Sequence, residues 1–358
     1  MKPIVVIAEK LADAGVEALR ADCEVVDAVD VPREELLAAV APAAGLVVRS
    51  ATQVDAELLA AAPGLSVVGR AGIGVDNIDL EAATAAGVLV VNAPTANAVS
   101  AAEHTLALLL SQARRIPEAD RTLRDGVWDR GRFRGIEVHG KTLGVIGLGR
   151  IGTLVAQRAL AFGMRVVAHD PYVGEERARR LGIDLAADLD DLLGSADFIS
   201  IHLPKTRATE KMIDAAALGR TKPGVRIVNT SRGGIIDEDA LAEAVRSGHV
   251  AGAALDVFSS EPLADSPLFE LPQVVLTPHL GASTVEAQDK AGTDVAAAVA
   301  AALRGELVAS AVNVDFAGEV HDDVVPFLPV ARHLGATFAA IAGGLPAQLA
   351  LRVEGRLS

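Results

Sequence analysis

Residues 143–152 read LGVIGLGRIG, an apolar run that leads into three glycines, Gly147, Gly149 and Gly152. A GxGxxG pattern alone is a weak signal, because glycine-rich turns are common. Here the surrounding pattern supports it. Residues 143–146 predict a strand, 151–162 a helix and 165–168 a second strand. This order of strand, glycine turn, helix and strand is typical of a dinucleotide-binding unit.

Each glycine has a physical role in such a unit. Gly147 permits the tight turn, Gly149 lets the backbone approach a pyrophosphate, and Gly152 lets the helix pack closely. The helix N-terminus presents N–H groups and a positive dipole end to the phosphates. Asp170 lies about 20 residues further on, where a carboxylate binds the adenosine ribose and repels a 2′-phosphate. We therefore expect NAD as the cofactor, although Asp170 before Pro171 would in isolation be read as a turn residue.

Outward from this unit, two series of β-rich runs alternate with helical patterns, which predicts an α/β protein with two parallel, doubly wound sheets. The first series comprises residues 4–8, 24–28, 45–49, 65–69 and 88–91. The second comprises residues 143–146, 165–168, 198–202, 225–229, 253–257 and 274–276.

Two long helical stretches, 98–115 and 284–303, flank the second series. We expect them to carry the chain between two domains. The first domain would be discontinuous, formed by residues 1–98 and 300–316, and the second would be formed by residues 99–299. Residues 317–358 would form a third, incomplete segment.

Composition narrows the class of protein. A net charge of −14 argues against nucleic acid as a partner. The single cysteine, Cys23, cannot form an internal disulfide, and no cluster has metal-ligand spacing. Residues 334–351 are uncharged, but Gly343, Gly344 and Pro346 favour a helix followed by a strand over a membrane span. We expect a cytoplasmic protein with neither a membrane segment nor a metal.

Three groups suited to hydride transfer on a 2-keto acid follow predicted strands. Arg232 could pair bidentately with a carboxylate, His279 could move a proton near neutral pH, and Glu261 could orient that histidine. Ligands bind at the carboxyl ends of strands in such sheets. Each residue also has an ordinary alternative, as a solvated arginine, a loop glutamate or a structural histidine.

Four motifs together carry a resemblance: VIGLGRIG at 145–152, NTSRGG at 229–234, GAALDVF at 252–258 and PHLGAST at 278–284. In this order, over roughly residues 1–316, they resemble the D-2-hydroxyacid dehydrogenase family. The resemblance implies a Rossmann NAD-binding domain inserted into a flavodoxin-like substrate-binding domain. It assigns Arg232 to the substrate, His279 to acid–base catalysis and Glu261 as its partner. The implied cofactor contacts are Gly147, Gly149, Arg150, Ile151, Gly152, Asp170, Thr230, Ser231, Asp256, His279, Gly281 and Ala282.

Residues 69–79 (GRAGIGVDNID) and 92–97 (NAPTAN) resemble the members of the family that oxidise 3-phospho-D-glycerate to 3-phosphohydroxypyruvate, the first step of L-serine biosynthesis. The resemblance places Gly72 against the substrate carboxylate. It places Arg49, Ser50 and Arg70 at the substrate phosphate. It also implies a homodimer or homotetramer, in which Arg130 or Arg132 reaches the neighbouring subunit's site. A solvated basic loop is the alternative for those two arginines.

The end of the chain departs from the longer members of this group. Residues 319–358 resemble only the start of their intervening domain, with a helix at 324–342 and a strand at 349–354, or are disordered. We expect a shortened form without serine feedback. Two other functions stay open: a glyoxylate or hydroxypyruvate reductase or another member of the family, and a NAD-sensing, corepressor-like interaction protein. A plain binding module fits the Arg232, Glu261 and His279 set poorly.

Overall fold

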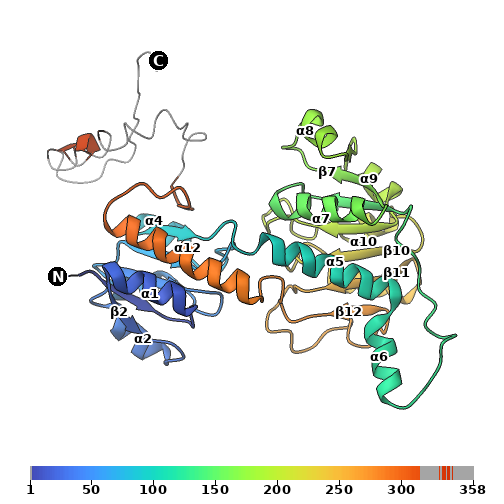
Figure 1. The fold of residues 1–358 in the computed structure, drawn as a ribbon, viewed down its shortest axis with the longest axis horizontal. Helices are drawn as coiled ribbons and strands as arrows, with labels where there is room; N and C mark the ends of the chain where they lie inside the picture. Colours follow the sequence, from blue (N-terminus) through green and yellow to red (C-terminus); the bar gives the residue numbers. More distant parts are fainter. Residues whose placement is uncertain (1, 315–329, 331–332, 336, 339–340, 342–358) are drawn as a thin grey trace. The chain divides into compact units, whose positions relative to one another are not determined.

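A computed structural model describes residues 2–314, 330, 333–335, 337, 338 and 341. Within these residues the strands form two parallel sheets, one of five strands and one of seven (Figure 1). The chain divides into two compact units, the first made of Met1–Ala93 and the chain from Gly292 on, the second of Pro94–Ala291. The expectation of two parallel α/β domains is confirmed.

The first unit is built on a sheet of order β2-β1-β3-β4-β5, the flavodoxin-like arrangement. Its strands are β1 (Ile4–Ile7), β2 (Glu24–Asp27), β3 (Gly45–Val48), β4 (Val67–Arg70) and β5 (Leu89–Asn92). Its helices are α1 (Asp13–Asp22), α2 (Arg33–Val40), α3 (Ala56–Ala61), α4 (Leu80–Ala85) and part of α12 (Val285–Leu303).

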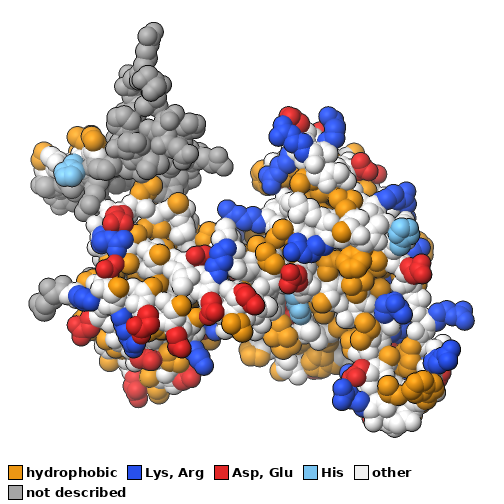
Figure 2. All heavy atoms as spheres, in the orientation of Figure 1, with side chains coloured by type: hydrophobic (Ala, Val, Ile, Leu, Met, Phe, Trp, Pro, Cys, Tyr) orange, Lys and Arg blue, Asp and Glu red, His pale blue; other side chains and the backbone are white. Residues whose placement is uncertain are grey.

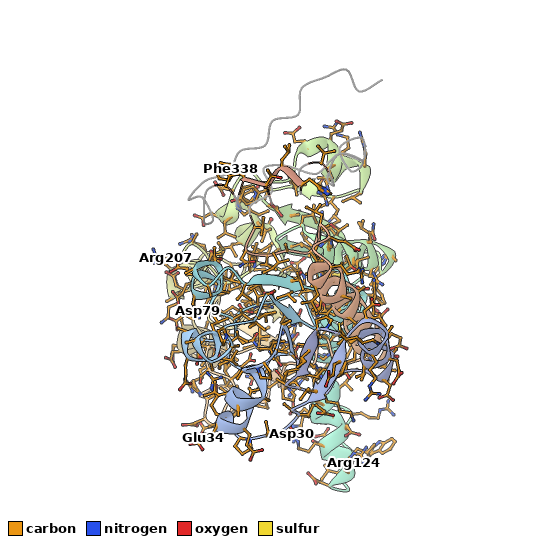
Figure 3. The ribbon with its side chains drawn as sticks, turned by 90° about the vertical axis from the view of Figure 1, so that its left-hand side faces the viewer. Asp30, Glu34, Asp79, Arg124, Arg207 and Phe338 are labelled. Carbon is orange, nitrogen blue, oxygen red and sulfur yellow. The ribbon has the colours of Figure 1, made fainter. Side chains whose placement is uncertain are left out.

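Both faces of this sheet are covered because consecutive strand residues point to opposite sides. Val6 and Val48 pack in one core cluster with residues of α2, α3 and α4. Val5 and Val47 pack in another with residues of α1 and α12. Polar side chains fix where helices begin: Asp79, labelled in Figure 3, accepts a hydrogen bond from the Ala82 N–H at the start of α4.

The second unit is built on a sheet of order β12-β11-β10-β9-β6-β7-β8. Its strands are β6 (Thr142–Ile146), β7 (Arg165–His169), β8 (Asp184–Leu185), β9 (Phe198–Ile201), β10 (Val225–Asn229), β11 (Val250–Leu255) and β12 (Val274–Leu276). Its helices are α5 (Ala98–Arg114), α6 (Ile116–Arg124), α7 (Arg150–Ala161), α8 (Glu175–Arg180), α9 (Leu189–Ser195), α10 (Ala215–Gly219) and α11 (Glu238–Arg246).

Read from β8 to β11, this order is the 3-2-1-4-5-6 arrangement of the Rossmann fold, with β12 added at the edge. Helices α5 and α7 pack on one face and α9, α10 and α11 on the other. The two-residue strand β8 is absent from the strands expected above. Its sequence, Asp184-Leu185, is too short to produce a recognisable alternation of apolar residues.

The unit boundaries lie at 93/94 and 291/292, whereas we expected 98/99 and 299/300. The second difference has a clear packing reason. Val295, Ala296 and Val299 of α12 belong to the core cluster of the first unit, so that helix joins this unit eight residues earlier than expected.

The membrane and C-terminal expectations concern mostly residues outside the described part. Within the expected helix 324–342, the described residues are helical, and the Thr337 hydroxyl donates to the His333 carbonyl at 2.7 Å. The rest of that helix and the expected strand 349–354 lie outside the described residues. No helix among the described residues has the length and apolarity needed to cross a membrane.

Candidate active site

The carboxyl ends of β10, β11 and β12 bring three predicted residues to one edge of the second sheet. Arg232 lies three residues after β10, Asp256 directly follows β11, and His279 lies three residues after β12. These strands are neighbours in the sheet. Their loops therefore meet where ligands bind in open α/β sheets.

His279 and Glu261 form the central pair of this edge. The His279 Nδ1 lies 2.6 Å from the Glu261 Oε2. Because an ionised carboxylate can only accept, Nδ1 carries the proton, and in the neutral ring Nε2 is the basic nitrogen. The Phe258 N–H donates to the other Glu261 oxygen at 2.9 Å and holds the carboxylate in place.

Electrostatics favour the protonated form of His279. The hydrogen bond that His279 donates to Glu261 raises the pKa of His279 above the ordinary value, while burial and the nearby positive charge of Arg232 act to lower it. For Glu261, burial acts to raise the pKa, but the hydrogen bonds from His279 and the Phe258 N–H outweigh burial, so the pKa is lowered. The pair is thus held as a carboxylate beside a histidine that binds protons readily.

Asn229, the last residue of β10, shapes the loop that carries Arg232. Its side-chain oxygen accepts from the Ser231 N–H at 3.0 Å and from the Ser231 hydroxyl at 2.8 Å. Its side-chain nitrogen donates to the Arg232 carbonyl at 2.9 Å. Arg232 itself donates to the Ser231 carbonyl at 2.7 Å. Thr230 is buried against Thr105, with 2.6 Å between the two hydroxyl oxygens.

Asp256 is fully buried and holds the turn that carries His279. Its carboxylate accepts from the Thr277 hydroxyl at 2.6 Å and from the Leu280 and Gly281 N–H groups at 2.7 and 2.8 Å. These contacts make it a positioning residue for the turn. Its contact with the cofactor, implied by the resemblance, stays a prediction.

His104 on α5 contacts the turn that carries His279, a role that the sequence analysis did not assign to it. Its Nε2 lies 3.1 Å from both the Asp256 carboxylate and the Thr277 hydroxyl, so it helps to hold the turn that carries His279. A signal for it existed in the sequence. His104 lies next to Thr105 which, with Gln112, is a buried polar residue of a helix whose buried face is otherwise made of alanine and leucine.

The glycine loop after β6 fits a dinucleotide phosphate. A Cβ on Gly147 would lie 2.5 Å from the His202 carbonyl, and one on Gly152 would lie 2.0 Å from the Gly147 carbonyl, so the turn closes only with glycine there. A Cβ on Gly149 would meet nothing within 4 Å, so this backbone faces open space. Gly149 is the N-cap of α7 and makes no side-chain capping bond.

Asp170 lies directly after β7, where the sequence predicted it. Its two oxygens accept from the Leu148 and Tyr172 N–H groups at 2.8 and 2.9 Å, which ties the glycine loop to the end of β7. Arg150 donates to the Pro94 carbonyl at 3.2 Å. The predicted roles of Asp170 and Arg150 in cofactor binding are therefore proposals.

The predicted substrate residues of the first unit lie at the carboxyl edge of its own sheet. Val48 of β3 pairs with Arg70, the last residue of β4, so Arg49 and Arg70 lie at the carboxyl ends of neighbouring strands. A Cβ on Gly72 would lie 1.7 Å from a guanidinium nitrogen of Arg70, so the guanidinium lies close to this glycine. Among the described residues, no group of three or more His, Cys, Asp or Glu side chains has the arrangement to hold a metal ion.

Comparisons with known proteins show what this chain is similar to. A family model of the NAD binding domain of D-isomer specific 2-hydroxyacid dehydrogenases matches residues 106–281. The D-3-phosphoglycerate dehydrogenases of Mycobacterium leprae and Mycobacterium tuberculosis are each 60% identical over 358 residues, covering 99% of this chain and 67% of theirs. The chloroplastic D-3-phosphoglycerate dehydrogenase 2 of Arabidopsis thaliana is 48% identical, covering 98% of this chain and 57% of its own.

Solved structures show the same fold. A glyoxylate reductase from Paecilomyes thermophila has a TM-score of 0.78 at 31% identity, covering 86% of this chain and 97% of its own. A D-lactate dehydrogenase from Aquifex aeolicus, complexed with NAD and lactic acid, has a TM-score of 0.77 at 29% identity, covering 87% of this chain and 100% of its own. The expected cofactor, NAD, is confirmed by the matching domain. The chain belongs to the family of D-isomer specific 2-hydroxyacid dehydrogenases.

Proposed function

We propose that this chain oxidises 3-phospho-D-glycerate to 3-phosphohydroxypyruvate with NAD, the first step of L-serine biosynthesis. The observation that carries the reaction type is the 2.6 Å bond between His279 and Glu261 at the carboxyl edge of the second sheet. The choice of substrate rests on relatives named D-3-phosphoglycerate dehydrogenase at 60% identity and on Arg49 and Arg70 at the carboxyl ends of β3 and β4.

His279 is the proton acceptor in this direction. Its Nε2 takes the proton of the C2 hydroxyl while Nδ1–H stays bonded to Glu261. The negative charge of Glu261 stabilises the imidazolium that results. In the reverse direction the same imidazolium returns the proton to the keto oxygen.

Arg232 binds the carboxylate and the C2 oxygen of the substrate. Its planar guanidinium can form two parallel charge-assisted hydrogen bonds, which fixes the orientation of the reacting carbon. The bonds from Asn229 support this role because they hold the Arg232 backbone in one conformation.

The N–H groups at the start of α7 would hold the NAD pyrophosphate, and Asp170 would hold the adenosine ribose. Thr230, Ser231, Asp256, Gly281 and Ala282 would line the nicotinamide end. When bound, NAD⁺ supplies the acceptor for the C2 hydride. The carboxylate of Asp170 disfavours a 2′-phosphate, which supports NAD over NADP.

Arg49 and Arg70 are proposed to bind the substrate phosphate, with Ser50 beside them and Gly72 close to the carboxylate. Arginine suits this task because its fork of donors matches phosphate oxygens. The Arg70 guanidinium lies close to Gly72, so the residues assigned to the two ends of the substrate are neighbours in the first unit.

The test compares reduction of 3-phosphohydroxypyruvate, hydroxypyruvate and glyoxylate by NADH. We expect kcat/KM for the phosphorylated substrate to exceed the others by at least 100-fold, since losing two charge-assisted hydrogen bonds costs about 3 kcal/mol or more. Arg70→Ala should remove most of that preference and leave hydroxypyruvate reduction little changed. A preference for hydroxypyruvate or glyoxylate would instead make the chain a reductase of unphosphorylated acids. Dependence of that turnover on His279 would still distinguish an enzyme from a corepressor-like sensor.

The pH dependence of oxidation should report the Glu261–His279 bond. Only neutral His279 accepts a proton, so oxidation by the wild-type enzyme should rise with pH through the raised pKa of His279. In Glu261→Gln the carboxylate that raises this pKa is gone while burial still lowers it, so the rise should move to lower pH. An unmoved kcat/KM–pH profile would show that another group titrates.

We further propose that the protein is a homo-oligomer. Helix α6 has no buried residue, and Figures 1 and 2 show it standing out from the second unit. Ile116, Leu123, Val127 and Trp128 of this helix and its following loop are all more than half exposed. Beside α6, Arg226 and Phe269 line a hollow of about 670 Å³, and the Arg226 Nε is buried without a partner.

The exposed apolar residues of α6 and its following loop, beside a hollow lined by Arg226, suit contact with a second copy of the chain. Arg132 already binds Glu118 of its own chain at 3.1 Å, so a role for Arg132 at a neighbouring subunit needs this ion pair to open. Sedimentation of the purified protein would test this proposal, because a monomer at micromolar concentration would contradict it.

We also propose a cytoplasmic location. An acidic chain whose single cysteine is buried and free supports it.

A further inference from the structure

The loop after β3 is organised by a side chain from a neighbouring strand. Glu9 follows β1, and the loop Arg49–Thr52 follows β3, with β1 and β3 adjacent in the sheet. In a sheet of order β2-β1-β3-β4-β5 the direction of winding reverses between β1 and β3. Ligands bind in the crevice at that reversal. Glu9 therefore lies at the position where the fold itself favours a ligand.

Four consecutive backbone N–H groups converge on the Glu9 carboxylate. Oε1 accepts from the N–H of Arg49 at 2.8 Å and of Thr52 at 2.9 Å. Oε2 accepts from the N–H of Ser50 at 3.2 Å and of Ala51 at 3.1 Å. One side chain thus satisfies every backbone donor of a loop that has no helix or strand bonds of its own.

Asn77 closes the loop from the other side. Its Nδ2 donates to the Arg49 carbonyl at 3.1 Å and to the Thr52 carbonyl at 2.6 Å. The first and last residues of the loop are therefore bound through both their N–H and their C=O groups. The Arg49 side chain also reaches the carbonyl of Lys10, the residue after Glu9, at 3.5 Å.

Glu9 places a negative charge at the same sheet edge as Arg49 and Arg70, which are proposed to bind an anionic phosphate. An uncompensated carboxylate there would repel an anionic ligand. Burial acts to raise the pKa of Glu9, but the hydrogen bonds from the N–H groups of Thr52, Ala51 and Arg49 outweigh it, and the pKa is lowered. The N–H groups of the loop thus stabilise the negative charge of Glu9.

We propose that Glu9 is a positioning residue that sets specificity for the phosphorylated end of the substrate by holding the Arg49–Thr52 loop. This inference rests on the proposed function, in which Arg49 and Ser50 meet the phosphate. Glu9 does not touch the substrate. It fixes the backbone from which the Arg49 guanidinium and the Ser50 hydroxyl extend.

The variant that tests this is Glu9→Gln, which keeps the shape but turns one acceptor oxygen into an NH₂ that faces N–H groups. We expect KM for 3-phosphohydroxypyruvate to rise about 10- to 100-fold, because small displacements of a binding group have effects of this order. The change in kcat should stay within about three-fold, and kcat/KM for hydroxypyruvate should change by no more than that. NADH affinity should be unaffected, and amide hydrogen exchange over residues 49–52 should accelerate.

The matched control is Asp27→Asn. Asp27 ends β2 in the same sheet, and its carboxylate accepts from the Val29 N–H at 3.0 Å, away from the loop. This variant should leave both KM values and the exchange of residues 49–52 at the wild-type level. If Glu9→Gln fails to fold, Glu9→Asp keeps the charge and should show a smaller rise in the same KM.

The outcomes separate the two proposals. A wild-type enzyme without preference for the phosphorylated substrate would refute the proposed function before any variant is compared. A wild-type preference that Glu9→Gln or Glu9→Asp leaves intact would refute the role of Glu9 alone. Equal losses for the phosphorylated and unphosphorylated substrates would likewise refute it, because they would show a general structural effect instead of positioning of the phosphate site.

Discussion

Replacing His279 with glutamine is expected to lower kcat for 3-phosphohydroxypyruvate reduction by about 10²- to 10⁴-fold, the range attributed to a positioned acid or base. Glutamine can still donate to Glu261, so the loop should keep its shape. It cannot deliver a proton from a group of near-neutral pKa. Steady-state kinetics should therefore show the loss in kcat, while fluorescence titration should show a much smaller change in NADH affinity, because His279 is only one of the predicted cofactor contacts.

His249→Gln is the control for this experiment. His249 lies just before β11, at the amino edge of the same sheet, and its Nε2 contacts the Leu218 carbonyl at 2.9 Å and the Thr221 hydroxyl at 3.1 Å. Its variant should keep kcat within about two-fold and differ at most in stability. A His279 variant that retained wild-type kcat would show that His279 is not the acid–base residue. Another histidine would then have to be tested in that role.

The second large effect is expected from Arg232→Ala. Loss of a bidentate pair with the substrate carboxylate removes two charge-assisted hydrogen bonds of about 1.5–3 kcal/mol each. That corresponds to a fall in kcat/KM of about 10²- to 10⁴-fold. Both KM and kcat should worsen, because the same contact binds the substrate and orients its C2 atom. Arg232→Lys should recover only part of the loss, since an ammonium cannot reproduce the planar fork.

A surface arginine of the same unit provides the comparison. Arg220 pairs with Asp190 at 2.8 Å, and nearly half of its side chain is exposed. Its alanine variant should change kcat/KM by less than about two-fold, because exposed ion pairs contribute little. Wild-type kcat/KM in Arg232→Ala would show that another cation holds the carboxylate.

The cofactor half of the fold could be predicted in detail because its signals are local. A strand, a glycine turn, a helix and a second strand occupy residues 142–169, and the pattern of 143–168 identified all four elements to within one or two residues. Asp170 could be found by counting, since its distance from the glycines follows from the length of one helix and one strand. Spacing along the chain is enough wherever the interacting groups belong to one βαβ unit.

The catalytic residues were a partly local prediction. Each of Arg232, Glu261 and His279 follows a strand, which placed them at one edge of the sheet without showing that they meet. The 2.6 Å bond between Glu261 and His279 depends on how two separate loops fold against each other. Candidate residues were therefore available from the strand ends, the resemblance implied that Glu261 is the partner of His279, and the structure shows the bond between them.

Sequence by itself determined that strands and helices alternate in two series, and it located the glycine loop and the candidate side chains at the strand ends, because hydrophobic periodicity and turn residues act over a few positions. Tertiary structure decided what those side chains are bound to. Glu9 reaches a loop 40 residues away, and His104 reaches Asp256 across 152 residues. Contacts of this kind join strands and helices that are neighbours only after the sheet has formed, and a buried carboxylate is stable there only when the assembled backbone supplies its hydrogen-bond donors.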